Sequence, residues 1–451
     1  MKKKRFLAIV VVLLMFVTVF AGCNGDTAPP PPPPPPPPAD NGDDPGDNGD
    51  EGWHPVFDLL PNTALSGFFN PHDIPDRTDI DMALPFVPAD PNNIVIGWTE
   101  ITLSDAWFVA AYEEARRQTN ERGWTLHFDV AEHDLALQSA QIDSFIARGV
   151  DIIVVDPTDV VGVTAPIRRA VEAGIPVIGF GSEIFGAPVI TSITGNTFMN
   201  GFVAGRHAGR YAFDPNEQIV SGVVLGVMGN STAESRVNGM MSGFIYGRAI
   251  ARGNPISMED AVYYSTRLFQ DLVRTGTFNS DTWNMRCVAI HEGLWTDEGG
   301  LAGGEIIIAA AGDELNLIWA ENDFQGNGAI RAIRNFGLTD QVRVVSPGNG
   351  VREFFSLIED GYMIANASHS ATAFAAATFD MIAELAAGTN TWDENNLPGL
   401  TAFDPIVFHA DNWRDYYDPD PANPFHIVPP LRILSIPELR QAILDGTYGG
   451  L

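Results

Sequence analysis

Short apolar segments alternate with helix-like segments along most of this chain after residue 92. The first apolar segments are residues 92–100, 125–131, 150–157 and 175–180. Between the first two, Phe108, Ala111 and Ala115 recur at the spacing of one helix face, and Asp105 stands where it can cap the helix start. Near-continuous apolar strands separated by helices are typical of a parallel sheet covered on both faces, so we predict an α/β fold.

The same alternation starts again near residue 219. The second set of predicted strands is 219–229, 287–293, 315–322 and 341–348, with helices near 233–250, 298–311, 325–336 and 351–360. Two doubly wound parallel-sheet domains therefore follow one another. Ligands bind such sheets beyond the carboxyl ends of their strands, so a cleft between two facing edges is the expected site.

The first 22 residues have the layout of an export signal. Met1–Arg5 is cationic, and Phe6–Phe20 is apolar but shorter than a membrane-spanning helix. The following "FAGC" resembles the lipobox of bacterial lipoproteins, in which Cys23 is acylated, although Phe20 departs from the usual Leu or Val. We expect acyl chains on Cys23 to insert into a lipid bilayer. The alternative is an ordinary signal peptide with an incidental cysteine.

The composition of residues 23–52 predicts a spacer. Ten consecutive prolines favour a stiff extended helix, and the acidic stretch after them has almost nothing apolar to bury. A proline run is also a ligand for aromatic grooves, but next to a lipid anchor we favour a disordered linker. The folded part is expected to start at Trp53.

Composition excludes several kinds of chemistry. The formal net charge is −31, and every lysine lies at positions 2–4, so Schiff-base, Walker-lysine and Ser-Lys chemistry are excluded after the signal. The acidic balance also argues against nucleic acid as a partner. Cys287 is the only other cysteine, and the nine histidines show no HExxH spacing. We therefore expect no disulfide framework, no metal and no cofactor.

Several segments, in the same order, resemble one known family. They are "LQSAQIDSFIARGVDIIVVDPTD", "VEAGIPVIGF", "NSTAESRVNGM", "WAENDFQGNGAIRAI" and "LIEDGYMIANASH". They look like the type I periplasmic sugar-binding proteins and lipoproteins of ABC importers, which include the ribose- and galactose-binding proteins. The likeness covers roughly 92–250 and 287–388.

The resemblance implies a three-strand hinge between the domains, near Gly195–Asn196, Ser368–Ser370 and Phe403–His409. The first domain would then be 53–195 plus about 370–402. The second would be 196–369 plus about 403–451, with an insertion at 251–286. In this family the domains close around the ligand, which requires that the ligand bind the closed state better than the open one.

The resemblance also implies a set of ligand-binding residues. These are Asp105, Trp107, Phe108, Glu183, Arg236, Trp295, Asn322, Asn349 and His369. Aromatic faces suit the apolar faces of sugars, and a guanidinium donates to two neighbouring hydroxyls at once. The alternatives are that Trp107 and Phe108 are core residues, that Arg236 is an ordinary surface arginine, and that Asn322 only caps a turn.

The chain departs from the family in three places. Gly181 and Ser182 stand where relatives have an Asp-Arg pair, with Glu183 as a possible substitute for the aspartate. The ligand is then a sugar with a different hydroxyl pattern, an amino sugar, a cyclitol or a less sugar-like molecule. Residues 251–286 and 389–451 are additions, and 435–446 carries the S-x-x-E pattern of a capped helix.

The sequence as a whole predicts an extracytoplasmic solute-binding lipoprotein. It would capture a sugar-like molecule, deliver it to ABC permease subunits, and be anchored at the outer face of the cytoplasmic membrane, on the cell surface or in the periplasm. The alternative is a sensor that reports to a membrane kinase or chemoreceptor. An enzyme is not expected, because the phosphate-loop and G-x-S-x-G motifs are missing. Carboxylates such as Asp105 and Glu183 are the alternative, as a glycosidase pair.

Overall fold

The structure is a computed structural model. It describes residues 53–72, 85–104, 106–389, 397, 399–401, 406–417, 433–445 and 447–448. The predicted signal, Cys23, the proline-rich linker and Asp105 lie outside these residues.

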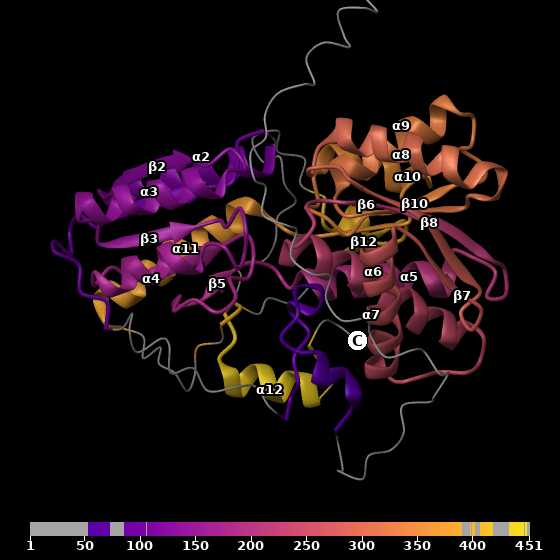
Figure 1. Cartoon of the computed structure of the whole chain (residues 1–451), viewed down its shortest axis with the longest axis horizontal. Helices are drawn as coiled ribbons and strands as arrows, with labels where there is room; N and C mark the ends of the chain where they lie inside the picture. The colour runs from indigo at the N-terminus through magenta and orange to yellow at the C-terminus, as the bar shows by residue number, and fades with distance from the viewer. Residues whose placement is uncertain are drawn as a thin grey trace, which may run out of the picture. The chain divides into compact units, whose positions relative to one another are not determined.

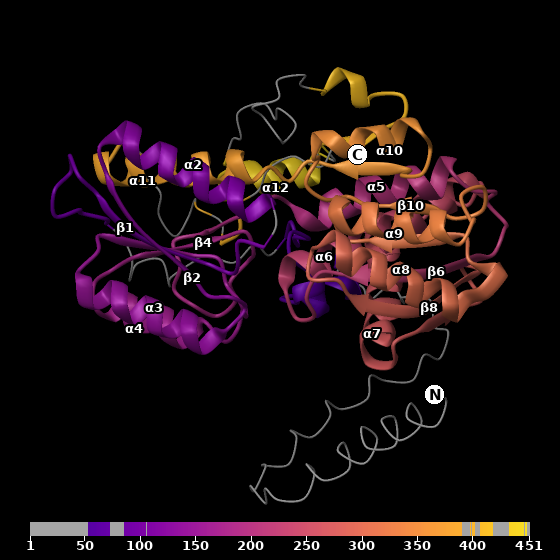
Figure 2. The same ribbon diagram turned by 90° about the horizontal axis from the view of Figure 1, so that it is seen from above.

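The first domain is built on a parallel sheet. Its strands are β1 (Val95–Glu100), β2 (Thr125–Val130), β3 (Ile152–Val155), β4 (Val177–Phe180) and β5 (Ser192–Ile193), in the order β2-β1-β3-β4-β5. Its helices are α2 (Ala106–Arg122), α3 (Leu135–Arg148), α4 (Thr164–Glu172) and α11 (Ala371–Ala387). Helices α2 and α11 cover one face of the sheet, and α3 and α4 cover the other (Figure 2). The predicted parallel sheet with helices on both faces is confirmed.

The second domain repeats this plan. Its strands are β6 (Ile219–Leu225), β7 (Phe278–Ser280), β8 (Met285–Glu292), β9 (Leu317–Ala320) and β10 (Arg343–Val345), in the order β10-β9-β6-β8-β7. Its helices are α5 (Thr197–Tyr211), α6 (Ser231–Ala251), α8 (Asp297–Ala311), α9 (Asp323–Asn335) and the short α10 (Phe355–Glu359). Helices α8 and α9 lie on one side of the strands, and α5 and α6 on the other (Figure 1). Strand β7 alone is antiparallel, at the edge.

Local signals in the sequence place several helix ends. The Asp134 carboxylate accepts hydrogen bonds from the Ala136 and Leu137 amides at the start of α3, and Gly149 ends that helix with φ +67°. The S-x-x-E pattern forms a full capping box at Ser435 and Glu438 at the start of α12 (Ile436–Leu444).

Three passages of the chain connect the two domains. The first runs from β5 to α5, and the second from β11 (Ala365–Ala367) to α11. In the third, Leu400 bridges to β5 while β12 (Val407–His409) pairs antiparallel with β11. The Asn200 side chain donates to the Ser368 carbonyl at 3.0 Å, and the Ser368 amide donates to the Ile406 carbonyl at 2.9 Å. These bonds join the passages where the family resemblance places a hinge. Of the predicted third segment, Phe403–His409, residues 403–405 lie outside the described residues.

The added segments share a further apolar cluster with the turns near the start of the folded part and with α5. The insertion 251–286 contains helix α7 (Met258–Thr275) and strand β7, which extend the second domain. The 3-10 turns η1 (Pro55–Leu59) and η2 (Thr63–Leu65) pack on α7 and α6. Val56, Phe68, Phe198, Val262 and Leu439 share this core. Residues 53–72, which we grouped with the first domain, therefore pack on the second, because their apolar side chains are buried against its helices.

Helices α5 and α6 cross in close contact through glycines four residues apart. Three lie on α5 (Gly201, Gly205, Gly209) and three on α6 (Gly239, Gly243, Gly247). A Cβ atom added at Gly205 would lie 1.9 Å from the Met240 carbonyl oxygen, and one at Gly243 would lie 1.9 Å from the Phe202 carbonyl oxygen. The absence of side chains at these positions sets the distance between the two helices.

A pair of stacked histidines connects α5 with β12, beside the hinge. The rings of His207 and His409 lie 4.2 Å apart at 17°. Burial, and then the neighbouring His409, lowers the pKa of His207 to about 4 from 6.5, with Asp411 opposing the shift. An unfolded chain accepts the proton near pH 6.5, whereas the folded chain resists it until about pH 4. The stability contributed by neutral His207 is therefore complete above pH 6.5 and is lost as the pH falls to about 4.

We expect His207→Gln to lose less stability than the wild type on acidification, because glutamine does not titrate. Thermal unfolding midpoints measured from neutral pH down to pH 4 would show a shallower decline for the variant. His72→Gln, at an exposed position, serves as the control. If the unfolding midpoint declined equally in His207→Gln and in the wild type, His207 would not be a cause of the loss of stability in acid.

Candidate functional site

One cavity brings together side chains from both domains. It is lined by Ile101, Trp107, Phe108, Asp156, Gly181, Ser182, Thr232, Arg236, Trp295, Asn322, Asn349 and His369. Its empty volume is about 370 Å³, including space open to solvent. The lining residues follow the carboxyl ends of strands in both sheets or begin the next helix, where α/β sheets bind ligands. Seven of the nine residues that we predicted as ligand contacts line this cavity.

Trp107 and Phe108 lie in the first turn of α2 and form the aromatic wall of the first domain. The Trp107 indole N–H donates to the His369 carbonyl at 2.8 Å, and the two rings stack with centroids 5.3 Å apart. Burial, and then the Arg236 charge, lowers the pKa of His369 well below its usual value, so the imidazole is neutral. Both aromatic residues are buried and line the cavity. The two interpretations of these positions, as core residues and as ligand contacts, are therefore compatible.

Trp295 reaches the cavity from the second domain on a strained loop. Leu294 and Trp295 have φ angles of +50° and +59°, a left-handed conformation that is unfavourable for side chains of this size. The Trp295 indole fits only because Gly226 has no side chain: a Cβ there would lie 2.1 Å from the indole nitrogen. The Phe108 and Trp295 rings meet edge to face, with centroids 6.2 Å apart.

Asn322 holds this loop in place. Its side-chain oxygen accepts from the Gln325 amide and caps α9, and its Nδ2 donates to the Trp295 carbonyl at 3.1 Å. The capping role that we considered as an alternative is therefore present, in a residue that also lines the cavity.

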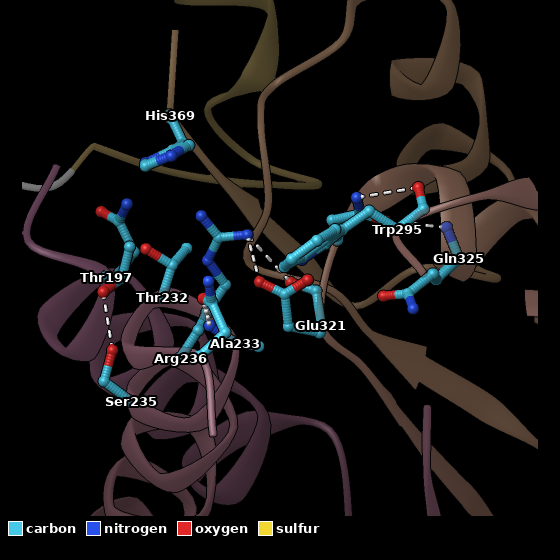
Figure 3. A network of polar contacts seen from close by, with 12 residues as sticks. Thr197, Thr232, Ala233, Ser235, Arg236, Trp295, Glu321, Gln325 and His369 are labelled. Carbon is cyan, nitrogen blue, oxygen red and sulfur yellow. Dashed lines mark hydrogen bonds and ion pairs between the residues drawn. The ribbon is translucent and has the colours of Figure 1, made fainter. Parts of the chain in front are cut away.

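Arg236, on α6, is the only strong base among the described lining residues. Its Nη1 donates to the Glu321 carboxylate at 2.6 Å, and the two side chains are 2% and 0% exposed. Figure 3 shows this pair near Thr232, Trp295 and His369. Within the described part of the chain, Arg236 Nε and Nη2 are buried without a hydrogen-bond partner. Because buried donors are costly when unsatisfied, a hydrogen-bond acceptor inside the cavity would satisfy these two nitrogens.

Asn349 lies in a loop connected to α9. Its backbone is left-handed, with φ +49°, a conformation that asparagine tolerates better than most residues. Two residues later, the Val351 amide donates to the buried Asp323 carboxylate at 2.8 Å. Burial raises the pKa of Asp323 to about 7. Asp323 therefore ties the Asn349 loop to the start of α9 from behind the cavity.

The loop Gly181–Glu183 makes contacts between the domains. The Thr232 hydroxyl donates to the Gly181 carbonyl at 2.7 Å, and the Ser182 hydroxyl lies 3.1 Å from that of Thr232. The Glu183 carboxylate accepts from the Ser66 hydroxyl at 2.5 Å, and Glu183 is not among the cavity-lining residues. We expected Glu183 to contact ligand; here Ser66, in the segment packed on the second domain, occupies that oxygen instead.

Asp156 is the carboxylate that this side of the cavity presents. It follows strand β3, is 1% exposed and lines the cavity. A Cβ at Gly181 would lie 2.7 Å from its Oδ2 atom, so the glycine is what admits the carboxylate. We did not predict Asp156, Ile101 or Thr232. Asp156 could have been predicted from its position directly after an apolar strand, because the carboxyl ends of strands meet at such clefts.

The described residues offer neither a metal site nor a membrane-spanning helix. No group of three or more His, Cys, Asp or Glu side chains in the described part of the chain is arranged to hold a metal ion. None of the described helices combines the length and apolar character needed to cross a membrane.

The chain belongs to the periplasmic binding protein family, whose domain model matches residues 96–390. The ribose import binding protein of Salmonella typhimurium is 23% identical over 264 residues, 58% of this chain and 75% of that protein. A Mycobacterium smegmatis ABC transporter solute binding protein with bound glycerol aligns with a TM-score of 0.59 at 18% identity, covering 74% of this chain and 100% of that one. The Caulobacter myo-inositol binding protein aligns with a TM-score of 0.57 at 17% identity, and the alignment covers 73% of this chain and 97% of that one. The two α/β domains are those of the type I fold.

Proposed function

We propose that the protein is an extracytoplasmic solute-binding lipoprotein that captures a sugar or sugar-like molecule in the cavity between its domains. The observation that carries the proposal is the convergence of seven predicted contact residues on one cavity. Three aromatic side chains and a buried guanidinium with two unsatisfied donor nitrogens match a molecule that has apolar ring faces and hydroxyl groups.

The contacts between the domains support a role in capture and delivery. Bonds from Thr232 to Gly181 and from Ser66 to Glu183 hold the two cavity edges together. A ligand that touches Trp107 on one side and Arg236 on the other adds to these bonds only when the domains are closed. It therefore shifts the population toward the closed form, which an ABC permease can recognise.

The relatives support this role. The named relatives and solved structures bind ribose or myo-inositol or belong to ABC transporters, and no relative named above is an enzyme. We propose that acyl chains on Cys23 hold the protein at the outer face of the cytoplasmic membrane, with the proline-rich segment as a spacer.

Tryptophan fluorescence and calorimetric titration of the full chain in mild detergent test the proposal. Saturable binding of a pentose, hexose, amino sugar or cyclitol should change the emission, because Trp107 and Trp295 line the cavity. Trp107→Ala should weaken binding at least tenfold, about 1.4 kcal/mol, through loss of a stacking face.

Trp53→Ala, at a position 41% exposed outside the cavity, should bind as the wild type does. If no member of these classes binds, or if both variants bind equally well, the proposed function is wrong.

A further inference from the structure

Residues 53–72 precede the first domain in the sequence but are fixed to the second. Their apolar side chains are buried in a cluster that they share with α5, α7 and α12. Polar contacts join the same segment to α6: the Thr63 hydroxyl donates to the Glu234 carboxylate, and the Asn238 side chain donates to the Ala64 carbonyl at 2.9 Å. The residues that follow directly are therefore held in place on the second domain.

Ser66 extends from this segment to the first domain. Its hydroxyl donates to the Glu183 carboxylate at 2.5 Å, and its side chain is buried. The next residue is held at the hinge, where the Asn196 side chain caps α5 and donates to the Gly67 carbonyl at 3.0 Å. Gly67 has φ +92°, and a Cβ there would lie 2.3 Å from Asn196 Oδ1, so the contact requires glycine. The position of Ser66 is therefore set by α6 before it and by the hinge after it.

The loop that carries Glu183 also bonds directly to the start of α6. The Glu183 amide donates to the Ser231 hydroxyl at 3.0 Å, and that hydroxyl donates to the Glu183 carbonyl at 3.2 Å. The Asn230 side chain donates to the Ser182 hydroxyl at 3.1 Å. These bonds add to the one from Thr232 described above. Each of them is lost when the domains separate, because its two partners belong to different domains.

We propose that Ser66, residues 181–183 and residues 230–232 form a latch that keeps the two domains closed in the absence of ligand. Ser66 is the positioning residue of this latch, because it holds the Glu183 loop against α6 from a segment fixed to the second domain. The bonds of the latch join protein groups only, so they stabilise the closed form before any solute binds. A solute enters only while the latch is open, and it leaves only when the latch opens again. This inference concerns the ligand-free protein and goes beyond the proposed function.

Hydrogen–deuterium exchange of the ligand-free full chain in mild detergent tests the latch. The Glu183 amide should exchange slowly in the wild type, because its hydrogen bond crosses to the second domain. Ser66→Ala should make this amide exchange about two to ten times faster, the ratio expected for the loss of one hydrogen bond. Ser139→Ala is the control, because the Ser139 hydroxyl contacts Arg169 within the first domain. The control should leave the exchange of the Glu183 amide unchanged.

Ser182→Ala gives the same test from the first domain, without changing residues 53–72. It removes a hydroxyl that contacts Asn230 and Thr232, and it leaves the hydrogen bond of the Glu183 amide in place. We expect the exchange of that amide to become about two to ten times faster here as well. Thermal unfolding of each variant would establish that it is folded before exchange is measured.

Slow exchange in the wild type that both variants accelerate supports the latch. If the wild-type Glu183 amide exchanges as fast as amides of an exposed loop, or if either folded variant leaves its exchange unchanged, these bonds do not hold the domains closed. Acceleration confined to residues 62–68 in Ser66→Ala would also overturn the inference, because Ser66 would then order only its own segment. No ligand enters these measurements, so a failure to bind sugars would overturn the proposed function and leave the latch intact.

Discussion

Arg236→Met is expected to abolish ligand binding and to lower the free energy of unfolding by about 3–5 kcal/mol, because it leaves a buried carboxylate without its cation. The Glu321 side chain is fully buried, and the Arg236 guanidinium lies 2.6 Å from it. The cavity also loses the two unsatisfied guanidinium nitrogens, Nε and Nη2, which we assign to ligand hydroxyls. Urea unfolding and titration with the ligand found for the wild type would measure both effects.

The double variant Arg236→Met/Glu321→Met separates stability from binding. Replacing both members of a buried ion pair with apolar residues of similar size is often neutral or stabilising. We expect the double variant to regain most of the lost stability while remaining unable to bind. Restored binding in the double variant would show that Arg236 does not contact ligand, and an unchanged stability in the single variant would show that the buried pair is not closely coupled.

Most of the fold could be predicted because strand–helix alternation is a local pattern. The strands β1, β3, β4, β6 and β9 were each preceded or followed by a helix with a clear stripe, cap or glycine end. Helix α5 was missed because its first nine residues are all buried, and its partly exposed polar residues, Arg206, His207 and Arg210, lie only in its last part. The packing of residues 53–72 on the second domain was missed. A short turn segment has no hydrophobic periodicity from which its packing partner could be predicted.

The site could be predicted where a residue follows a strand or begins a helix. Chain topology brings such positions to one edge, which is why Trp107, Arg236 and Asn322 line the same cavity. Partners across the cavity could not be predicted. Glu183 was expected at the ligand, but its carboxylate accepts from Ser66, more than a hundred positions earlier in the chain. The Arg236–Glu321 pair depends on the distance between α6 and the end of β9, and this distance cannot be predicted from a sequence pattern.

The glycines of α5 and α6 are a sequence signal that we did not use. Spacing of four residues places Gly201, Gly205 and Gly209 on one face of α5, and Gly239, Gly243 and Gly247 do the same on α6. Small residues at this spacing allow two helix backbones to approach closely. The carbonyl of Arg236 lies only 2.1 Å from a Cβ built at Gly201, so this contact also fixes the residue that lines the cavity.

Gly205→Ala is therefore expected to lower the free energy of unfolding by about 4 kcal/mol or more, although alanine favours a helix over glycine by about 1 kcal/mol. The added methyl group would lie 1.9 Å from the Met240 carbonyl oxygen. Backbone atoms of two packed helices cannot move aside singly, so the helices must separate. Arg236 would then shift with α6, and ligand affinity should fall together with stability.

Gly326→Ala on α9 is the matched control. This glycine is also buried in a helix, but its nearest neighbours are Ser346 Cβ and Oγ at 3.0 Å and the flexible Met363 Cε at 3.1 Å, so a small shift makes room for a methyl group. We expect the control to change stability by less than about 1 kcal/mol. Thermal and urea unfolding of the two variants would give the comparison. If Gly205→Ala is as stable as Gly326→Ala, the two helices can separate at little cost, and the glycine contact does not hold Arg236 at the cavity.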